Sequence, residues 1–168
     1  RDSADSLPWD DLARATGRRG TLVMLMATAR MHTHLTRLIA CGLSADTPAA
    51  AIEWGSTASQ KTILATLGTL AHEAKSSGLR APAVLVVGEC AALGRNLKWF
   101  EAMPLFGRRI VITRASVDAT DFAARIRALG GEAIEFPTIA TASPSSYETL
   151  DRAIAEIDSF DWVIFTSA

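Results

Sequence analysis

Short apolar runs alternate with segments of helical periodicity through the first hundred residues. The runs are bounded by Gly, Pro, Asp and Thr and are rich in Val, Ile, Leu and Ala, which favours buried strands. We expect these strands at 20–27, 48–55, 60–65 and 82–89. Between and after them, apolar residues recur every three or four positions, which predicts helices at 28–41, 67–77 and 90–101.

The remaining residues repeat a simpler order of strand, helix, strand, helix and strand. The strands are expected at 108–114, 132–139 and 161–168, and the helices at 118–131 and 145–161. The first helix should bury Phe122, Ile126 and Leu129, which share one stripe. Because short connections of this kind place successive strands parallel with right-handed crossovers, the pattern predicts an incomplete βαβαβ unit.

The segment 97–115 joins the two patterns. It passes Pro104 and Gly107 before the second strand pattern starts. The join is short for a flexible linker, so we expect a fairly fixed orientation between two domains. We predict the boundaries as a first domain at 1–101, a linker at 102–107 and a second domain at 108–168.

The composition is that of a packed globular chain. Of the 168 residues, 49% are hydrophobic and 21% are charged, and the net charge of −1 gives no overall attraction to nucleic acid or an anionic membrane. No apolar run reaches the roughly 20 residues of a membrane span, and the first residues lack the apolar core of a signal peptide. The two cysteines, Cys41 and Cys90, suit buried or half-buried thiols rather than a disulfide framework. We therefore expect a cytoplasmic protein without nucleic-acid or membrane partners.

No short motif in the chain names a reaction. The G-x-G-x-x-G, P-loop, G-x-S-x-G and C-x-x-C patterns are all absent. His32 and His34 lie two apart on a predicted helix and so point away from each other. That spacing is poor for a metal pair, and we expect no metal site.

Two positions near strand ends are candidates for ligand contact. Gly55 follows the second strand, where a glycine either makes a turn or lets a ligand approach the backbone. Met24 and Met26 are two apart on the first predicted strand and so share a face. They either fill the core or line an adaptable ligand surface.

Hydroxyl groups and an arginine end two strands of the second part. Thr113 and Arg114 close the first of these strands, and Thr166 and Ser167 close the last. In open α/β sheets ligands bind beyond the carboxyl ends of the strands, and a guanidinium can hold a carboxylate there. These four residues are candidate substrate-binding groups, and polar caps at strand ends are the alternative.

Two sets of blocks carry a resemblance to known families. From Gly20 to Glu101, "GTLVMLMA", "DTPAAAIEWGSTASQKTILATLGTL" and "PAVLVVGE" resemble the C-terminal half of uroporphyrinogen-III C-methyltransferase, in the tetrapyrrole methylase family. From Leu105 to Ala168, "LFGRRIVITRA", "LGGEAIEFPTI" and "DWVIFTSA" resemble the N-terminal part of uroporphyrinogen-III synthase. The order resembles that of a fused bifunctional enzyme.

The resemblance implies a fold, a cofactor and two reactions. The fold is α/β, with a mixed-sheet methylase subdomain followed by part of a two-lobed synthase. The methylase would transfer methyl groups from S-adenosylmethionine to uroporphyrinogen III, giving precorrin-2 on the way to sirohaem and cobalamin. The synthase would close hydroxymethylbilane into uroporphyrinogen III. Met26 and Gly55 align with cofactor-contacting positions of the methylase, and Thr113, Arg114, Thr166 and Ser167 lie on loops that match the synthase cleft.

The same resemblance implies that much of each enzyme lies outside this chain. The chain begins at Arg1 without a methionine and stops at Ala168 as a strand pattern ends, so we expect a piece of a longer protein. That piece should be inactive in both reactions and carries no residue that we can assign as catalytic. The methylase family tends to dimerise, so a homodimer is an expected partner. The alternative is a non-catalytic two-part α/β module that binds a ligand or regulates another protein.

Overall fold

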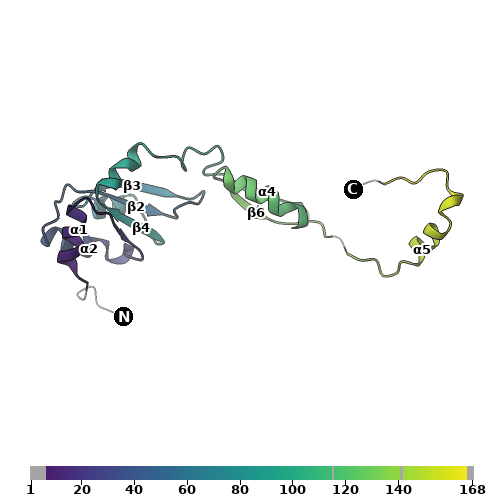
Figure 1. Cartoon of the computed structure of the whole chain (residues 1–168), viewed down its shortest axis with the longest axis horizontal. Helices are drawn as coiled ribbons and strands as arrows, with labels where there is room; N and C mark the ends of the chain where they lie inside the picture. The colour runs from purple at the N-terminus through teal and green to yellow at the C-terminus, as the bar shows by residue number, and fades with distance from the viewer. Residues whose placement is uncertain (1–6, 115, 141, 166–168) are drawn as a thin grey trace.

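The computed structural model describes residues 7–114, 116–140 and 142–165. It has two packed parts in succession and an extended C-terminal segment (Figure 1). The first part contains a four-stranded sheet and the second a two-stranded sheet, each with its own hydrophobic core. The α/β fold class predicted from the sequence is confirmed.

The first sheet has the strand order β1-β4-β2-β3. Its strands are β1 (Leu22–Met24), β2 (Pro48–Glu53), β3 (Lys61–Thr66) and β4 (Ala83–Val87). The four expected strands are therefore present, but all three pairings are antiparallel. The sheet is therefore antiparallel and not mixed as expected. Strands β1 and β2 run in the same direction, but β4 lies between them, so they do not pair with each other.

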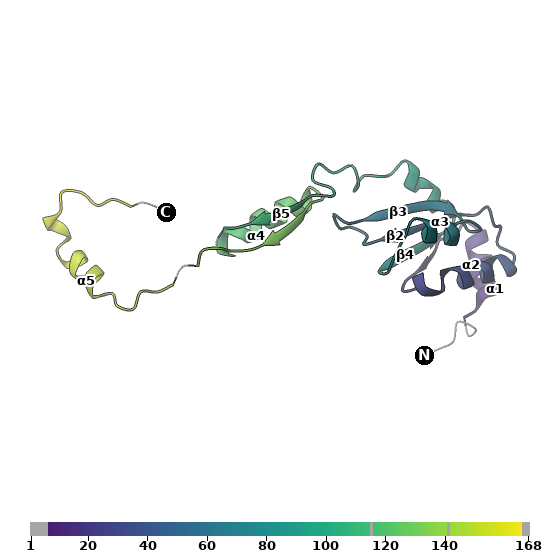
Figure 2. The same cartoon turned by 180° about the vertical axis from the view of Figure 1, so that it is seen from behind.

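Helices cover one face of this sheet. They are α1 (Trp9–Gly17), α2 (Met31–Ala40), which follows the 3₁₀ turn η2 (Thr28–Arg30), and α3 (Leu70–Ser76) (Figure 2). Leu35, Leu38 and Leu70 of these helices are at most 2% exposed and share a core with residues of β2 and β4. Helix α1 was not predicted. Its buried stripe is Trp9, Ala13 and Thr16, in which only Trp9 is strongly apolar.

The other face of the sheet is covered by η3 (Glu89–Arg95). The sequence predicted an α-helix over 90–101, but η3 is a 3₁₀ helix and turns follow it. A Cβ on Gly94 would lie 2.9 Å from Cδ2 of Leu64, so the glycine allows η3 to approach β3 closely.

Strand β1 is shorter and more exposed than the sequence indicated. It forms only over Leu22–Met24, at the edge of the sheet, and Val23 is 53% exposed. The run 20–27 is apolar along its whole length, so it predicted a longer buried strand. A continuous apolar run does not show which of its residues pair with a neighbouring strand.

The second part is a βαβ unit with parallel strands. Strands β5 (Arg109–Ile112) and β6 (Glu132–Glu135) are parallel, with α4 (Ser116–Ala128) between them along the chain. Helix α4 buries Ala119, Ala123 and Ile126 against Ile112. The predicted stripe was partly wrong, since Phe122 and Leu129 are each 45% exposed. The small alanines form the buried face and allow close packing on the strands.

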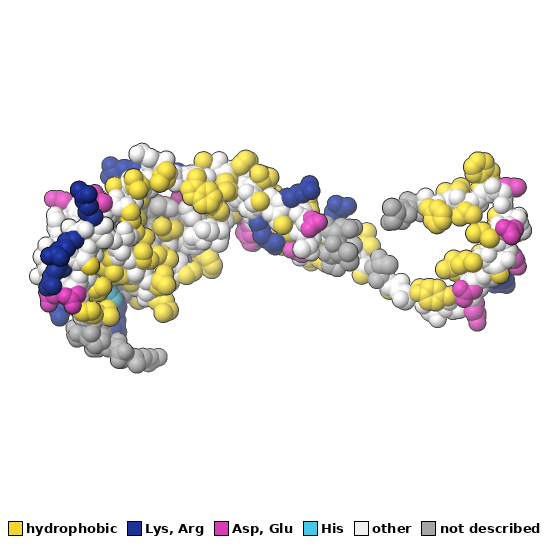
Figure 3. Space-filling model, in the orientation of Figure 1, with side chains coloured by type: hydrophobic (Ala, Val, Ile, Leu, Met, Phe, Trp, Pro, Cys, Tyr) yellow, Lys and Arg dark blue, Asp and Glu magenta, His cyan; other side chains and the backbone are white. Residues whose placement is uncertain are grey.

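The last segment extends away from both parts. It carries α5 (Glu148–Ala155) and η4 (Ile157–Ser159), and α5 lies apart from the sheets in both views (Figures 1 and 2). Its hydrophobic side chains are exposed (Figure 3), with Trp162 at 85% and Phe165 at 86%. The third strand expected at 161–168 is absent over 161–165, and the rest of that range lies outside the described residues.

Candidate functional site

The carboxyl ends of β1 and β2 lie at the same edge of the first sheet. Met24 of β1 is in register with Leu85 of β4, and Leu85 is in register with Ala51 of β2. Since adjacent strands are about 4.8 Å apart, β1 and β2 are separated by about 10 Å with β4 between them. The structure therefore brings the chain after β1, with Met26, to the edge at which Gly55 follows β2.

Met26 has an unusual conformation for an apolar side chain. It is 96% exposed and its backbone has a φ of 54°. An L-residue in this left-handed region costs about 1–2 kcal/mol relative to the right-handed one. The strand ends at Met24, which packs against the core, so the expected shared face of the two methionines does not extend to Met26. No contact in the described structure accounts for the exposure and the strain together.

Gly55 lies in the turn that joins β2 to β3. Its neighbours Trp54 and Ser56 have positive φ values of 49° and 62°, whereas Gly55 itself does not have a positive φ. A Cβ on Gly55 would lie 3.3 Å from Cγ2 of Ile52, which requires only a small shift. Gly55 lies in a turn, but a left-handed conformation does not explain why this position is a glycine.

Hydrogen bonds close the turn around these residues. The backbone N–H of Trp54 donates to the Pro82 carbonyl at 3.2 Å. The N–H and Oγ1 of Thr57 both donate to the Trp54 carbonyl, at 3.2 and 2.7 Å. The N–H of Ser56 donates to Oε1 of Gln60 at 2.8 Å. Trp54 and Ser56, two non-glycine residues of positive φ, are thus held by specific bonds at the edge of the sheet where Met26, also of positive φ, lies.

Sequence reasoning assigned no role to Gln60, although this residue lies in one of the blocks that carried the resemblance. Its Nε2 donates to Oε1 of Glu101 at 3.3 Å and to Oγ1 of Thr62 at 3.4 Å. Together with the bond from Ser56, these contacts join the turn to the segment that precedes the second part. The spacing of five residues between Gly55 and Gln60 was the available signal.

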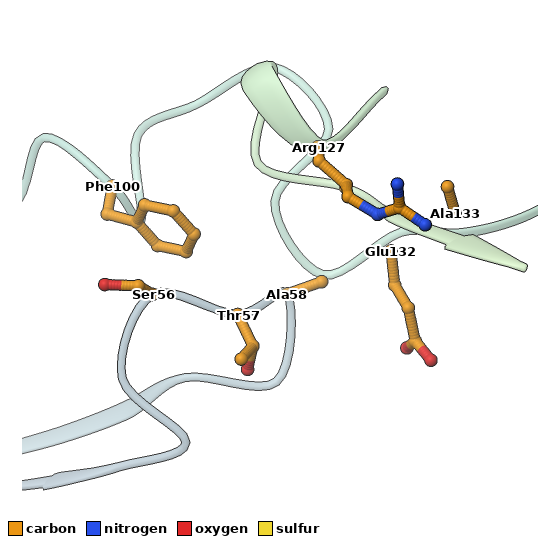
Figure 4. A pocket seen from close by; sticks show the side chains of 8 residues that line it. Ser56, Thr57, Ala58, Phe100, Arg127, Glu132 and Ala133 are labelled. Atoms are coloured by element: carbon orange, nitrogen blue, oxygen red, sulfur yellow. The ribbon is translucent and has the colours of Figure 1, made fainter. Parts of the chain in front are cut away.

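The turn also borders the second part of the molecule. Ser56, Thr57 and Ala58 line a cavity of about 230 Å³ together with Phe100 and, from the second part, Arg127, Gly131, Glu132 and Ala133. Figure 4 shows Ser56, Thr57 and Ala58 along the turn, with Phe100 above them and Arg127 and Glu132 on the opposite side. Arg127 is paired with Glu135 at 3.1 Å. Glu132 is paired with Arg109 at 2.9 Å, so both charged residues that line the cavity are in ion pairs.

The predicted substrate residues of the second part are only partly described. Thr113 and Arg114 are exposed and follow β5, at the carboxyl edge of the parallel sheet, as expected from the strand pattern. The Thr113 carbonyl accepts hydrogen bonds from the N–H and Oγ1 of Thr138, at 3.3 and 3.1 Å. Thr166 and Ser167 lie outside the described residues. The structure thus places two of the four residues at one edge.

The histidines and cysteines are not among the candidate positions predicted from the sequence. The ring of His34 packs edge-on against Trp9, and partial burial together with the nearby Arg30 guanidinium lowers the pKa of His34. Cys41 is half-buried as expected, but Cys90 is exposed. Within the ranges that the structure describes, no three His, Cys, Asp or Glu side chains are grouped to hold a metal. None of the helices described there is long and apolar enough to cross a bilayer.

Comparison with known proteins identifies what the two parts resemble. Residues 120–168 match the family Uroporphyrinogen-III synthase HemD. The chain is 32% identical over 162 residues to the Porphyrin biosynthesis protein HemD of Ruminiclostridium josui. It is 29% identical over 162 residues to the Uroporphyrinogen-III C-methyltransferase of Bacillus subtilis. Each alignment covers 96% of this chain and 32% of the relative, so the chain spans about a third of their length.

Several solved structures are also similar. One of them is the Uroporphyrin-III C-methyl transferase from Thermus thermophilus complexed with S-adenyl homocysteine, with 24% identity and a TM-score of 0.43. The match covers 52% of this chain and 37% of the crystallised one. The sequence relatives include both a synthase family and a methyltransferase. The resemblance to a methyltransferase joined to a synthase, predicted from the sequence, is confirmed.

Proposed function

We propose that this chain is part of a bifunctional enzyme of tetrapyrrole biosynthesis. Residues 1–101 form the C-terminal part of an S-adenosylmethionine-dependent methyltransferase that converts uroporphyrinogen III to precorrin-2. Residues 108–168 begin a synthase that cyclises hydroxymethylbilane to uroporphyrinogen III, and 102–107 join the two. The two reactions are consecutive, so the product of the second part is the substrate of the first. The proposal is supported by relatives whose names describe a methyltransferase and a synthase family.

The observation that carries the methyltransferase proposal is the pair Met26 and Gly55. Met26 is apolar, strained and almost fully exposed, and Gly55 has no conformational need to be a glycine. A ligand at this edge of the sheet would account for both. The thioether of Met26 is a soft, polarizable surface for an adenosyl group, and the absence of a Cβ at Gly55 lets a ligand approach the backbone.

The residues present therefore fit the cofactor implied by the resemblance. Met26 and Gly55 would hold the adenosyl portion and fix its position at the sheet edge. When bound, S-adenosylmethionine supplies a methyl group on a sulfonium. The role of this chain would be to orient the methyl group, because methyl transfer depends mainly on the alignment of the reacting atoms.

For the synthase part, we infer that the carboxyl edge of β5 contacts substrate. Arg114 would pair with a carboxylate of the linear tetrapyrrole, and the hydroxyls of Thr113, Thr166 and Ser167 would donate hydrogen bonds to neighbouring carboxylates. Such contacts bind and position the substrate.

Calorimetry of the full-length protein with S-adenosylhomocysteine tests the methyltransferase proposal. We expect one site per methyltransferase domain, saturable and competed by S-adenosylmethionine. Conversion of hydroxymethylbilane to uroporphyrinogen III, followed by the absorbance of the oxidised product, tests the synthase part. Absence of S-adenosylhomocysteine binding would contradict the first proposal, and absence of cyclisation the second.

Replacing Met26 with asparagine is expected to stabilise the protein and to weaken the cofactor site. Because asparagine tolerates the left-handed conformation, the free energy of unfolding should rise by about 0.5–1 kcal/mol. Loss of the thioether should weaken S-adenosylhomocysteine binding by roughly tenfold. Urea denaturation and calorimetry measure the two effects.

Leu25→Asn provides the matched control for this substitution. Leu25 is adjacent and 68% exposed, but its φ is not positive. The control should therefore give no gain in stability and retain the affinity. Unchanged affinity in Met26→Asn would remove Met26 from the cofactor site.

A further inference from the structure

The side chain of Gln60 joins three segments of the chain. Its Oε1 accepts a hydrogen bond from the Ser56 N–H at 2.8 Å. Its Nε2 donates to Oγ1 of Thr62 on β3 and to Oε1 of Glu101, 41 residues further along the chain. One amide thereby connects the turn after β2, the strand that follows it, and the segment before the second part.

The turn 54–57 has a backbone conformation that needs stabilising contacts. Trp54 and Ser56 both have positive φ values, a conformation that non-glycine residues rarely adopt and that surrounding contacts must maintain. The bond to Gln60 is made by the backbone N–H of Ser56 itself, so it acts at one of the two strained residues. In the described structure the other hydrogen bonds of the turn are made by Trp54 and Thr57, so this bond is the one that acts directly on Ser56, next to Gly55.

Glu101, the other partner, directly follows two residues of an aromatic cluster in the chain. Phe100 packs edge-on against both Trp99 and Phe106, with ring centroids 5.5 and 6.0 Å apart. Phe100 also lines the cavity shared with Arg127 and Glu132 of the second part (Figure 4). A second cavity of about 230 Å³ lies against Gln60 and Glu101. The turn is thus tied to a segment whose aromatic rings pack on one another and line the cavity between the two parts.

We propose that Gln60 and Glu101 form a positioning pair, which holds the turn 54–57 in the conformation that presents Gly55 to the cofactor. The pair also ties this turn to the start of the second part. The assignment rests on the proposed S-adenosylmethionine site. Neither side chain touches reacting atoms, and both act through the backbone of the turn. Because coupling is reciprocal, ligand binding at the turn also stabilises the contact at Glu101.

An exchange of charge between the two positions tests the pair in the full-length protein. Gln60→Glu keeps an acceptor for the Ser56 N–H but places a carboxylate against Glu101, so S-adenosylhomocysteine should bind roughly tenfold more weakly. Glu101→Gln alone should stay within about twofold of the wild type, because the Gln60 amide still finds a carbonyl acceptor. The double variant should recover the affinity to within about threefold, since the new amide at position 101 can donate to the new carboxylate.

The fluorescence of the ligand-free protein gives a second readout that is independent of the cofactor. Trp54 lies in the turn and Trp99 beside Glu101, so Gln60→Glu should change the emission and the double variant should restore it. Wild-type affinity in Gln60→Glu, or a double variant that does not recover, would overturn the pair. If the wild type itself binds no S-adenosylhomocysteine, the proposed cofactor site fails. The pair is then judged by the emission alone, where a shift reversed in the double variant supports it and no shift overturns it.

Discussion

Replacing Gly88 with alanine is expected to lower the free energy of unfolding of the first part by about 3 kcal/mol, from backbone strain and steric overlap together. Gly88 has a φ of 131° and a ψ of 174°, a region that is essentially restricted to glycine. A Cβ there would lie 2.6 Å from the carbonyl oxygen of Gly20, a backbone atom that cannot rotate away. The Gly88 N–H also donates to the Pro48 carbonyl at 2.9 Å, so relaxation of the backbone would disturb the contact with β2.

The consequence should be largest at β1, the strand that follows Gly20. This strand pairs with β4 through only three residues, and displacement of Gly20 would pull it from the sheet. Urea denaturation followed by circular dichroism measures the loss. Gly17→Ala is the control, because Gly17 does not have a positive φ and its Cβ would meet Cδ1 of Leu43 at an ordinary 3.7 Å. Equal stabilities for the two variants would show that the close approach at Gly88 has no energetic weight.

The strands that could be predicted from the sequence were those with pairing on both sides or strong turn signals at their ends. Strands β2 and β4 are central and have near-continuous apolar sequences, and both appear close to their expected positions. Helix α1 was missed because alanine and threonine occupy two of its buried positions. The extent of β1 was overestimated because pairing with β4, and not hydrophobicity, determines where the strand ends.

In the second part, the sequence predicted the helix but not the residues that it buries. The periodicity of α4 is real, but the residues that it buries are Ala119 and Ala123 rather than Phe122. Periodicity predicts how far apart the buried residues of a helix are. It does not predict which face of the helix is buried, because that depends on how closely the helix packs against the strands. The segment 161–165 has the composition of a strand and lacks one, because a strand needs a paired neighbour that the composition does not supply.

Met26 and Gly55 stay predictions as cofactor contacts, and the contacts that surround Gly55 were not predicted from the sequence. Met26 and Gly55 were identified by resemblance, and the antiparallel register explains why they share an edge. The positive φ values of Trp54 and Ser56 have no sequence signal, since neither residue is a glycine. The contact between Gln60 and Glu101 joins positions 41 residues apart, a distance along the chain that local patterns do not span.

Replacing Gly55 with valine is expected to weaken S-adenosylhomocysteine binding to the full-length protein by roughly 100-fold, equivalent to about 2.7 kcal/mol. The backbone conformation at Gly55 is open to any residue, and the nearest side-chain atom is Cγ2 of Ile52 at 3.3 Å from the added Cβ. The variant should therefore fold with little loss of stability. A branched side chain would instead occupy the space in which the proposed ligand approaches the backbone, so the effect should fall on affinity.

The comparison that separates these two effects is Ser59→Val. Ser59 is exposed in the same turn, and its N–H donates to Oγ1 of Thr57 at 3.2 Å through the backbone, which the substitution leaves in place. It should retain both stability and affinity. Calorimetry and urea denaturation of the three proteins then distinguish the explanations for Gly55. Lost affinity with retained stability places the ligand at the backbone of this turn, whereas lost stability with retained affinity means that the glycine serves only the packing against Ile52.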